Sequence, residues 1–596
     1  MGEAPMNEPH PPSQGVSQSG DGSATFTVWA PDAERVELVT PDARRPMRRG
    51  DGNPYGREHW TATLADVSRG FRYGYAVDGG PTRPDPATRW QPDGVHEMSA
   101  VDFPGDHDWR HPFAGVPRRD LVIYELHVGT FTPAGTFDAA IARLPDLVEL
   151  GITAIEVMPV SQFPGTRGWG YDGVHPFAVQ HSYGHDGDGP AAFRRFIDAA
   201  HGLGLGVILD VVYNHFGPEG NYLAAFGPYT TGRYRTPWGE GLNFDGRGSD
   251  MVRRFVCDNV RHWIGDYRLD GLRLDAIQTM IDVSARHVLS DIAQTAREAA
   301  GDRIVHVIGE TDQNDVRLVQ PTKQNGIGLD AIWADDLHHA IHALVTGESD
   351  TYYADFHPPH AKPAGAIADC LAGGLSRAGR YSAFRGHKAG RPYPDDAARS
   401  RLVTCLQNHD QVGNRAFGDR LHTTCSPAQY RLAVALNLLA PLTPLVWMGE
   451  EYAEPRPFPF FCDFGDPAIN EAVRRGRAEA YWPDDPVWTD AMPDPPRRRT
   501  FESAVLTWDW SDPDQSSLRT LYRDLLAIRR ERLREEIPPR VDRDGDVLHV
   551  RYERFALLAN LGGQAQPIEA TDVLRSTLRD VGQVGELQPW EAVVVM

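Results

Sequence analysis

Eight short apolar runs, each ending in polar or charged residues, repeat from residue 121 onward and constrain the fold more than any other feature. A parallel strand covered on both faces is apolar along its whole length, as these runs are. Amphipathic helical patterns separate the runs; residues 190–200, for example, place Phe193, Phe196 and Ile197 on one face. This alternation predicts an α/β fold, namely a (β/α)8 TIM barrel. The runs are 121–129, 154–160, 206–215, 271–277, 304–311, 330–336, 404–410 and 444–451.

An open, doubly wound sheet is the other architecture that such a repeat can form. Dinucleotide-binding sheets of that kind carry a Gly-rich turn after the first strand, and no such turn follows residues 121–129. The closed barrel is therefore preferred, with its domain spanning residues 106–535. Residues 216–250 are long for a loop between a strand and a helix and are rich in Gly, Pro and Tyr. They predict an excursion that helps to wall the active site.

Shorter alternating segments on both sides of the barrel predict two small β domains. Residues 26–30 and 72–77 belong to a predicted N-terminal β-sandwich over 22–105, and residues 536–596 form a predicted C-terminal β domain. The first 21 residues are polar and rich in Pro, Gly and Ser. Such a composition cannot bury enough apolar surface to fold, so a disordered tail is expected.

The net charge and the cysteines limit the partners and the compartment. With a formal net charge of −22 and no Lys/Arg-rich run, the chain would repel a phosphate backbone, which argues against nucleic acid as a partner. The five cysteines are widely spaced and form no CxxC pair, so free thiols in a reducing compartment are expected. The chain has no apolar run of about 18 residues and no apolar signal-peptide core. We therefore expect a cytoplasmic protein without a membrane partner; the oligomeric state is left open.

Polar side chains gather where the predicted barrel strands end, the edge at which such barrels bind their substrates. Carboxyl groups at the ends of strands four, five and seven are a costly arrangement, because like charges that are crowded together raise one another's pKa. Hydrolysis of a glycosidic bond uses such a group: one carboxyl protonates the leaving oxygen and a carboxylate meets the developing cation. The candidates are Asp210, Asn214 and His215 at strand three, Arg273 and Asp275 at strand four, Glu310 at strand five, Asp335 and Asp336 at strand six, and His409 and Asp410 at strand seven.

The spacing of two of these residues suggests how their roles divide. Side chains at positions i and i+2 of a strand share a face, so the guanidinium of Arg273 can hold Asp275 ionised and nucleophilic. Glu310 is expected to lie near Asp275 and Asp410, whose charges would raise its pKa and keep it protonated as an acid.

Four segments resemble the α-amylase superfamily, glycoside hydrolase family 13, and the resemblance extends over about residues 22 to 596. It implies a retaining hydrolase of α-glucan oligosaccharides, in which Asp275 is the nucleophile and Glu310 the general acid/base. Asp410 would be the carboxylate that binds sugar hydroxyls in the transition state. The four segments, which occur in the family's order, are DVVYNH (210–215), GLRLDAI (271–277), IGET (308–311) and QNHD (407–410).

The same resemblance implies further substrate contacts. His215 and His409 would hydrogen-bond the sugar whose bond is cleaved, in subsite −1, and Tyr171, in WGYDGVHPF, would form an aromatic platform under it. No metal and no cofactor is predicted, because the calcium-binding loop of secreted amylases is not recognisable. The candidates for recognising the leaving-group side of the substrate are Asp335, Asp336 and His339.

Several residues keep more than one interpretation. Asp210 and Asn214 are expected to brace a strand end rather than touch sugar. Trp169 and Trp238 could be stacking platforms, although packing is the commoner role of an aromatic residue in a large enzyme. His342 is expected at the surface, and the N-terminal sandwich, which resembles a carbohydrate-binding module, is expected to brace the barrel.

Two other functions remain open at the level of sequence. A glycogen branching enzyme also joins an N-terminal sandwich to this barrel and would pass the sugar to another sugar hydroxyl instead of water. The flanks of the sixth and seventh strands fit that enzyme less well. A non-catalytic glucan-binding protein is the other, although all three carboxyls of the motifs are present.

Overall fold

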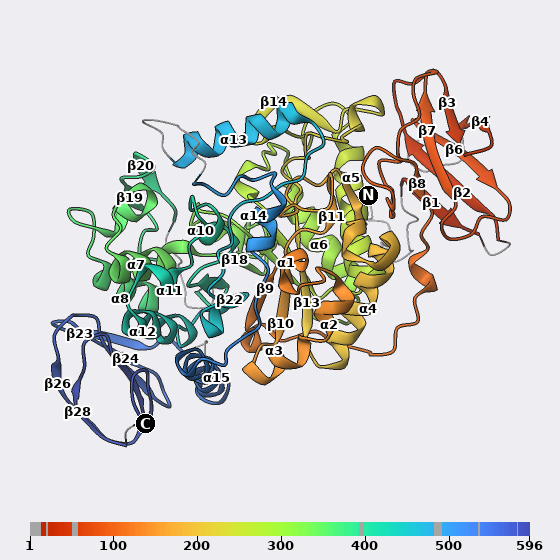
Figure 1. Ribbon diagram of the computed structural model, residues 1–596. Coiled ribbons are helices and arrows are strands. Elements are labelled where there is room, and N and C mark those ends of the chain that lie inside the picture. The colour runs from red at the N-terminus through yellow and green to blue at the C-terminus, as the bar shows by residue number, and fades with distance from the viewer. Residues whose placement is uncertain are drawn as a thin grey trace.

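The computed structural model describes residues 13–19, 22–50, 58–391, 399–481, 491–533, 537–580 and 582–596. At its centre, eight parallel strands close into a barrel (Figure 1), which confirms the predicted TIM barrel. The strands follow one another around the barrel in chain order, as right-handed strand–helix units require. They are β9 (Ile123–Leu126), β10 (Ala154–Val157), β13 (Gly206–Val211), β16 (Gly271–Leu274), β17 (His306–Gly309), β18 (Ala331–Trp333), β21 (Leu402–Cys405) and β22 (Thr443–Trp447).

Helices surround the barrel and bury the apolar faces that the sequence pattern marks. On α4, Phe193, Phe196 and Ile197 are all buried against the strands. A separate group of aliphatic side chains, including Ile123, Ile208 and Ile308, fills one end of the barrel interior. The longer helices are α4 (Gly189–Gly202), α5 (Ser249–Arg261), α6 (Val288–Ala300), α7 (Asp335–Thr346), α8 (Pro363–Gly373), α12 (Pro427–Leu438), α13 (Pro467–Tyr481) and α15 (Pro513–Arg532).

Two four-stranded sheets precede the barrel and pack face to face through residues such as Phe26 and Tyr73, whose ring centroids are 4.9 Å apart. Trp29 of this sandwich lies 5.1 Å from the ring of Tyr229 in the excursion after β13. The sandwich therefore contacts the barrel directly. Its strands are β1 (Gly15–Gln18), β2 (Ala24–Trp29), β6 (His59–Leu64) and β5 (Arg48–Arg49) in one sheet, and β4 (Arg44–Pro46), β3 (Val36–Val39), β7 (Arg72–Val77) and β8 (Ser99–Ala100) in the other.

The expected disordered tail over residues 1–21 is wrong for part of its length. Strand β1 pairs with β2, with Gly15 opposite Thr27, and Val16 is buried in the core. Ser13 donates from its backbone N–H and its hydroxyl to Asp258, at 2.8 and 2.6 Å. The polar composition hid a strand whose backbone is satisfied by pairing. Residues 1–12 and 20–21 lie outside the described residues.

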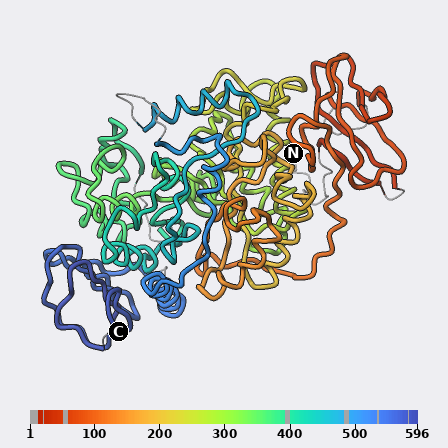
Figure 2. The backbone as a smooth tube through the Cα atoms, viewed as in Figure 1, coloured from red at the N-terminus to blue at the C-terminus, as the bar shows by residue number. Residues whose placement is uncertain are grey.

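The excursion after β13 contains an antiparallel hairpin, β14 (Thr230–Thr236) and β15 (Gly239–Leu242). The C-terminal strands form a five-stranded sheet and a two-stranded one. Figure 2 shows the N-terminal sandwich and this C-terminal unit on opposite sides of the barrel. The C-terminal strands are β23 (Arg540–Asp544), β24 (Val547–Arg551), β25 (Ala556–Asn560), β26 (Gln566–Ala570), β27 (Val573–Ser576), β28 (Val584–Leu587) and β29 (Ala592–Val595).

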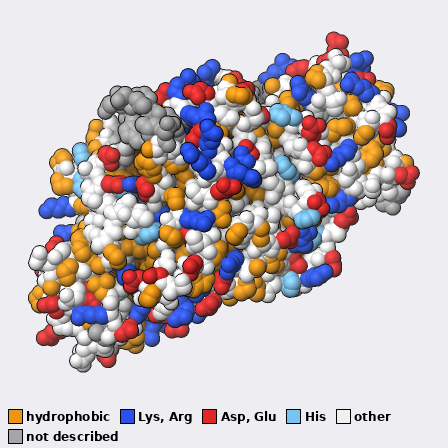
Figure 3. Space-filling model, viewed as in Figure 1, with side chains coloured by type: hydrophobic (Ala, Val, Ile, Leu, Met, Phe, Trp, Pro, Cys, Tyr) orange, Lys and Arg blue, Asp and Glu red, His pale blue; other side chains and the backbone are white. Residues whose placement is uncertain are grey.

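The surface carries both signs of charge. On the face shown in Figure 3, acidic and basic side chains are interspersed rather than segregated. Within the described part of the chain, none of the helices combines the length and the apolarity that a membrane span requires.

Candidate active site

One fully buried guanidinium organises the carboxyl groups at the barrel mouth. Arg273, on β16, is level with Asp210 of the neighbouring strand β13. Its Nη1 lies 2.7 Å from Asp210 Oδ2 and 3.0 Å from Asp275 Oδ1. Its Nη2 lies 3.6 Å from Glu310 Oε2. The fold thus gathers three carboxyls from three successive strand ends around one cation.

Asp275 has a donor on each carboxylate oxygen. Arg273 reaches Oδ1, and Asn214 Nδ2 donates to Oδ2 at 2.9 Å. Two such donors fix the orientation of the group. Asn214 therefore braces the carboxylate, in line with the role expected for it. An oriented carboxylate is what nucleophilic attack requires.

Glu310 is set apart from Asp275 by its protonation. Burial raises its pKa to about 8; the charge of Arg273 opposes this shift, and those of Asp275 and Asp410 add to it. The sequence pattern suggested the two aspartates as the cause, whereas burial is the larger one. Ala276, held in the left-handed region (φ 41°), directs its N–H to Glu310 Oε2. At neutral pH the site thus holds a proton-bearing acid beside a second carboxyl that has a donor on each of its oxygens.

A second set of hydrogen bonds at the barrel mouth joins Asp210 to His409 through the hydroxyl of Tyr171. Tyr171 Oη lies 2.6 Å from Asp210 Oδ2 and 2.7 Å from His409 Nε2. The rings of Tyr171 and His409 stack, with centroids 5.1 Å apart. His409 Nδ1 contacts Glu125 of β9. Motif residues 171, 210 and 409 thus form one continuous network, and Glu125 is a member that the motifs did not reveal.

Asp410 is the most accessible of the three predicted catalytic carboxyls, with 41% of its side chain exposed. It lies at the start of α10 (His409–Gly413). Asn414 Nδ2 donates to its Oδ1 at 3.0 Å, and His409 Nε2 lies 3.6 Å from the same oxygen. Asp410 therefore faces the space into which a sugar could enter.

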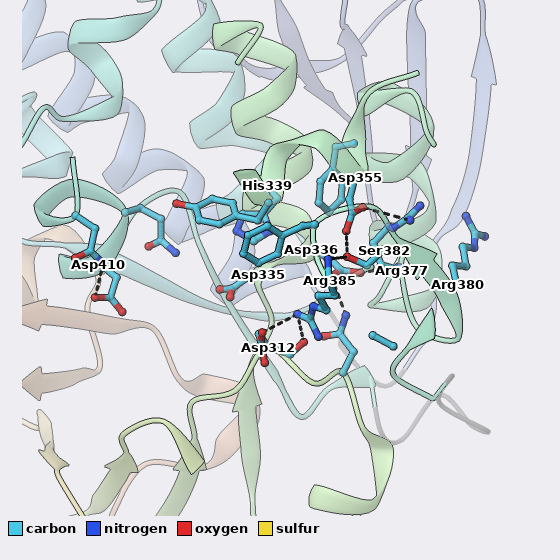
Figure 4. Close-up of a pocket in the computed structure, with 17 residues that line it drawn as sticks. Asp312, Asp335, Asp336, His339, Asp355, Arg377, Arg380, Ser382, Arg385 and Asp410 are labelled. Atoms are coloured by element: carbon cyan, nitrogen blue, oxygen red, sulfur yellow. Dashed lines mark hydrogen bonds and ion pairs between the residues drawn. The ribbon is translucent and has the colours of Figure 1, made fainter. Parts of the chain in front are cut away.

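A cavity of about 200 Å³ opens beside Asp410. Figure 4 shows Asp335, Asp336 and His339 along it, so the fold brings the three predicted leaving-group residues together. His339 stacks on Tyr352, with ring centroids 4.5 Å apart. Burial, followed by the charge of Asp336, raises the pKa of Asp335 to about 7.

Asp336 differs from its two neighbours in this cavity. Asn314 Nδ2 donates to Oδ1 at 2.9 Å, and the N–H groups of Ser376 and Arg377 donate to Oδ2 at 2.8 and 2.7 Å. Both carboxylate oxygens thus hold protein donors rather than facing the cavity unpaired. Asp336 shapes the cavity by fixing the loop at 376–377, and the direct sugar contact expected for it stays a prediction.

The far wall of the cavity comes from a hairpin that sequence analysis did not assign to the site. It comprises β19 (Arg380–Ser382) and β20 (His387–Ala389), and it carries Phe384 and Arg385. Arg385 pairs with Asp312 at 2.9 Å (Figure 4). The segment has neither helical nor strand periodicity of useful length, so only its high content of Arg and aromatic residues could have marked it.

His215 and the two uncertain tryptophans occupy different environments. His215 bonds to Asn214 Oδ1 at 2.7 Å and to the carbonyl of Tyr171 at 3.1 Å. Trp238, on the turn of the β14–β15 hairpin, stacks on the His215 ring at 5.2 Å and is 52% exposed. Trp169 is buried against Phe458. Trp169 is therefore a packing residue, and Trp238 offers an open ring face.

Two other histidines of α7, His338 and His342, act in packing. His338 Nδ1 bonds to the Leu406 carbonyl at 2.6 Å. His342 stacks on Tyr353 at 4.2 Å and pairs with Glu348 at 2.9 Å. It is buried, so its expected surface position was wrong; tertiary packing by the following segment covers it. Among the described residues no group of three or more His, Cys, Asp or Glu side chains has the geometry to hold a metal ion.

Comparison with known proteins places the chain beside characterised relatives. The model for the α-amylase catalytic domain matches residues 100–235, and that for carbohydrate-binding module 48, the isoamylase N-terminal domain, matches residues 13–89. A malto-oligosyltrehalose trehalohydrolase from Rhizobium sp. (strain M-11) is 43% identical over 96% of this chain and 98% of its own.

Two further matches differ in how much of the chain they cover. The crystal structure of a Salmonella typhimurium protein superposes with a TM-score of 0.88 at 37% identity, and the match covers 98% of this chain and 100% of that chain. The 1,4-alpha-glucan branching enzyme of Mesorhizobium japonicum is 32% identical, over 45% of this chain and 39% of its own. The likeness to the branching enzyme is thus partial, whereas the other two span the chain.

Proposed function

The chain belongs to the malto-oligosyltrehalose trehalohydrolases, a family of α-amylase-type glycosidases, and from this premise we propose how its own residues cleave the substrate. The reaction is hydrolysis of the α-1,4-glucosidic bond next to the terminal α,α-trehalose of a malto-oligosyltrehalose, with release of trehalose. Sequence segments outside the four motifs, such as 333–348 and 448–464, also resemble this family.

In the proposed first step, Glu310 protonates the glycosidic oxygen as the bond to the leaving sugar breaks. Asp275 attacks the anomeric carbon from the opposite side and forms a covalent glycosyl-enzyme. In the second step Glu310, now ionised, removes a proton from water, which displaces Asp275 and retains the anomeric configuration. The raised pKa of Glu310, about 8, supports its role as the acid at neutral pH.

The remaining motif residues position the sugar in this scheme. Asp410 would accept hydrogen bonds from sugar hydroxyls as positive charge develops on the ring. Tyr171 would support the face of that ring, and His215 and His409 would bind its hydroxyls. The released trehalose would occupy the cavity beside Asp410, with Asp335 and His339 as polar contacts and Asp336 as the residue that fixes the wall.

The observation that carries the mechanism is the position of Arg273 between the two reacting carboxyls. Nη1 contacts Asp275 at 3.0 Å and Nη2 lies 3.6 Å from Glu310. The two groups therefore lie at one barrel edge, as a double displacement at a single anomeric carbon requires.

The decisive experiment is the substitution Glu310→Gln, which keeps the shape of the side chain and removes the acid. We expect kcat on malto-oligosyltrehalose to fall by at least about 10²-fold, the lower end for a lost general acid, as followed by trehalose release. Glu298→Gln, an exposed change on α6, is the matched control and should leave the rate unchanged. Unaltered activity of Glu310→Gln would remove this residue from the mechanism.

The same assay separates the branching alternative. The wild-type enzyme should release trehalose and form no α-1,6 branches when it is incubated with amylose; branch formation would favour glucan transfer instead. We also propose a cytoplasmic location, which is supported by the five cysteines that all remain as free thiols.

A further inference from the structure

Glu125 is a buried carboxyl behind the active site that the proposed mechanism does not use. It lies on β9 and is 1% exposed, as is His409. Its Oε1 contacts His409 Nδ1 at 2.5 Å, and its Oε2 accepts the backbone N–H of His409 at 3.3 Å. Both oxygens of Glu125 thus contact His409, the residue that precedes Asp410 in the chain.

The hydrogen atoms around Tyr171 can be assigned from geometry. Asp210 Oδ2 receives a hydrogen bond from Arg273 Nη1 at 2.7 Å, and a guanidinium only donates. This oxygen therefore accepts from Tyr171 Oη as well, at 2.6 Å. Tyr171 has a single hydroxyl proton, and this proton is donated to Asp210. The 2.7 Å contact between Tyr171 Oη and His409 Nε2 must then be donated by the histidine.

The other ring nitrogen of His409, Nδ1, contacts the carboxyl group of Glu125. Glu125 accepts the backbone N–H of His409 with Oε2, and we take its Oε1 as the acceptor of the Nδ1–H of the same residue. With a proton on each nitrogen, His409 is an imidazolium cation. Consistently, its pKa is raised to about 9: burial opposes the charge, but Asp410 and Glu125 outweigh it.

Among the titratable groups around His409, Asp410 and Glu125 are the ones whose charges raise the pKa of the ring. Burial holds the pKa of Glu156 and of Tyr171 well above the ordinary value and lowers that of His127 to about 4, so these groups are neutral. Asp210 and Arg273 pair with each other and largely cancel.

We propose that Glu125 is a positioning residue that keeps His409 doubly protonated, so that the ring presents a charged Nε2–H donor to Tyr171 while its positive charge lies 3.6 Å from Asp410. This donor holds the tyrosine platform against Asp210 and offsets the charge of Asp410. The effect on catalysis rests on the proposed function, whereas the protonation of the ring does not.

The test begins with Glu125→Gln, which can keep both contacts. Its amide oxygen can accept the backbone N–H of His409 and its NH2 can donate to Nδ1, so the variant removes the charge alone. Glu156→Gln is the matched control: Glu156 is the register partner of Glu125 on β10, and within the described residues neither of its oxygens has a hydrogen-bond partner. Because Glu156 is already neutral, this control removes no charge.

The first readout is 15N NMR of histidine-labelled protein, with the His409 signals identified by their loss in His409→Gln. We expect both ring nitrogens to be protonated at pH 7 in the wild type and in Glu156→Gln. In Glu125→Gln the ring should titrate at least about one pH unit lower, the shift that corresponds to losing one charge-assisted hydrogen bond. A ring protonated only on Nε2 in the wild type, or an unchanged titration in Glu125→Gln, would overturn the proposal.

The second readout is the pH dependence of trehalose release. The activity of Glu125→Gln relative to the wild type should be about twofold lower at pH 8 and about fivefold lower at pH 9 if the ring pKa falls from about 9 by one unit, and it should recover towards pH 6, where the ring regains its proton. A purely structural role would give the same deficit at every pH.

If the amide variant does not fold, Glu125→Asp keeps a charge, and the His409 ring of that variant should remain doubly protonated at pH 7. If the wild type releases no trehalose, the proposed function is wrong, but the NMR result still determines whether both nitrogens of the His409 ring are protonated.

Discussion

At the scale of single residues, Glu310 and Asp275 contact the same guanidinium but have opposite environments. Asp275 has a donor on each oxygen, from Arg273 and Asn214. Glu310 Oε2 lies 3.6 Å from Nη2 of Arg273, and burial is the largest cause of its raised pKa. Two carboxyls with different protonation states at one pH are what an acid and a nucleophile require.

This difference predicts the alkaline limit of activity. The raised pKa of Glu310, about 8, means that the acid is protonated below that pH and is lost as the pH rises through it. We expect kcat/KM for trehalose release to decline with an apparent pKa near 8. A profile measured from pH 5 to 10 checks this, and an alkaline limb at the ordinary glutamate value would contradict the assignment.

At the scale of elements, α13 reaches the site from far along the chain. Figure 1 shows this helix above the barrel, on the same side as the β14 hairpin. Arg477 of α13 donates to Asn414 Oδ1 at 2.7 Å, and Asn414 donates in turn to Asp410 at 3.0 Å. The guanidinium also lies 3.8 Å from the ring centroid of Phe460. The helix thus orients Asp410 through a single intervening amide.

Removal of this support should lower the rate rather than the stability. We expect Arg477→Ala to reduce kcat about three- to tenfold, because Asn414 loses the donor that fixes its amide and Asp410 becomes less well oriented. Arg474→Ala is the control, since Arg474 lies on the same helix but pairs with Asp494. Equal rates for the two variants would exclude the relay, and steady-state kinetics with unchanged thermal midpoints would support it.

At the scale of the whole molecule, one buried aspartate ties the N-terminal sandwich to the barrel. Asp102 is completely buried and pairs with Arg69, from the sandwich, at 2.9 Å and with Arg194 of α4. Arg69 also pairs with Asp188 at the start of α4 at 2.6 Å. Burial alone would raise the pKa of Asp102, but Arg194 and Arg69 outweigh it and the pKa lies below its ordinary value.

Breaking this junction should destabilise the protein. Asp102→Ala leaves the guanidinium of Arg194 buried without its partner, a change that costs about 3–5 kcal/mol. Because the folded-state pKa is depressed, the contribution is present above the unfolded value and is lost as the pH falls through the folded one. The midpoint of denaturant unfolding should drop at pH 7 and the deficit should shrink in acid. Asp108→Ala, at an exposed position, should change neither.

Much of the site could be predicted from sequence because its residues follow strands. Asp275 and Glu310 come directly after short apolar runs, and barrel geometry sends all such positions to one edge. The hairpin with Phe384 and Arg385 could not be predicted, because it lies in an irregular segment. The position of Asp336 beside Asp335 placed it at the cavity, but its hydrogen bonds from Ser376 and Arg377 could not be predicted from the sequence.

The sequence by itself determined the barrel, the order of its strands and the carboxyls at their ends, since strand periodicity and strand-end polarity are local properties. Tertiary structure alone decided which groups are buried and which distant segments meet. Burial, more than neighbouring charge, protonates Glu310. The contact of Glu125 with His409 joins residues that are 284 positions apart, and no local pattern encodes such a contact because it exists only when the barrel has closed.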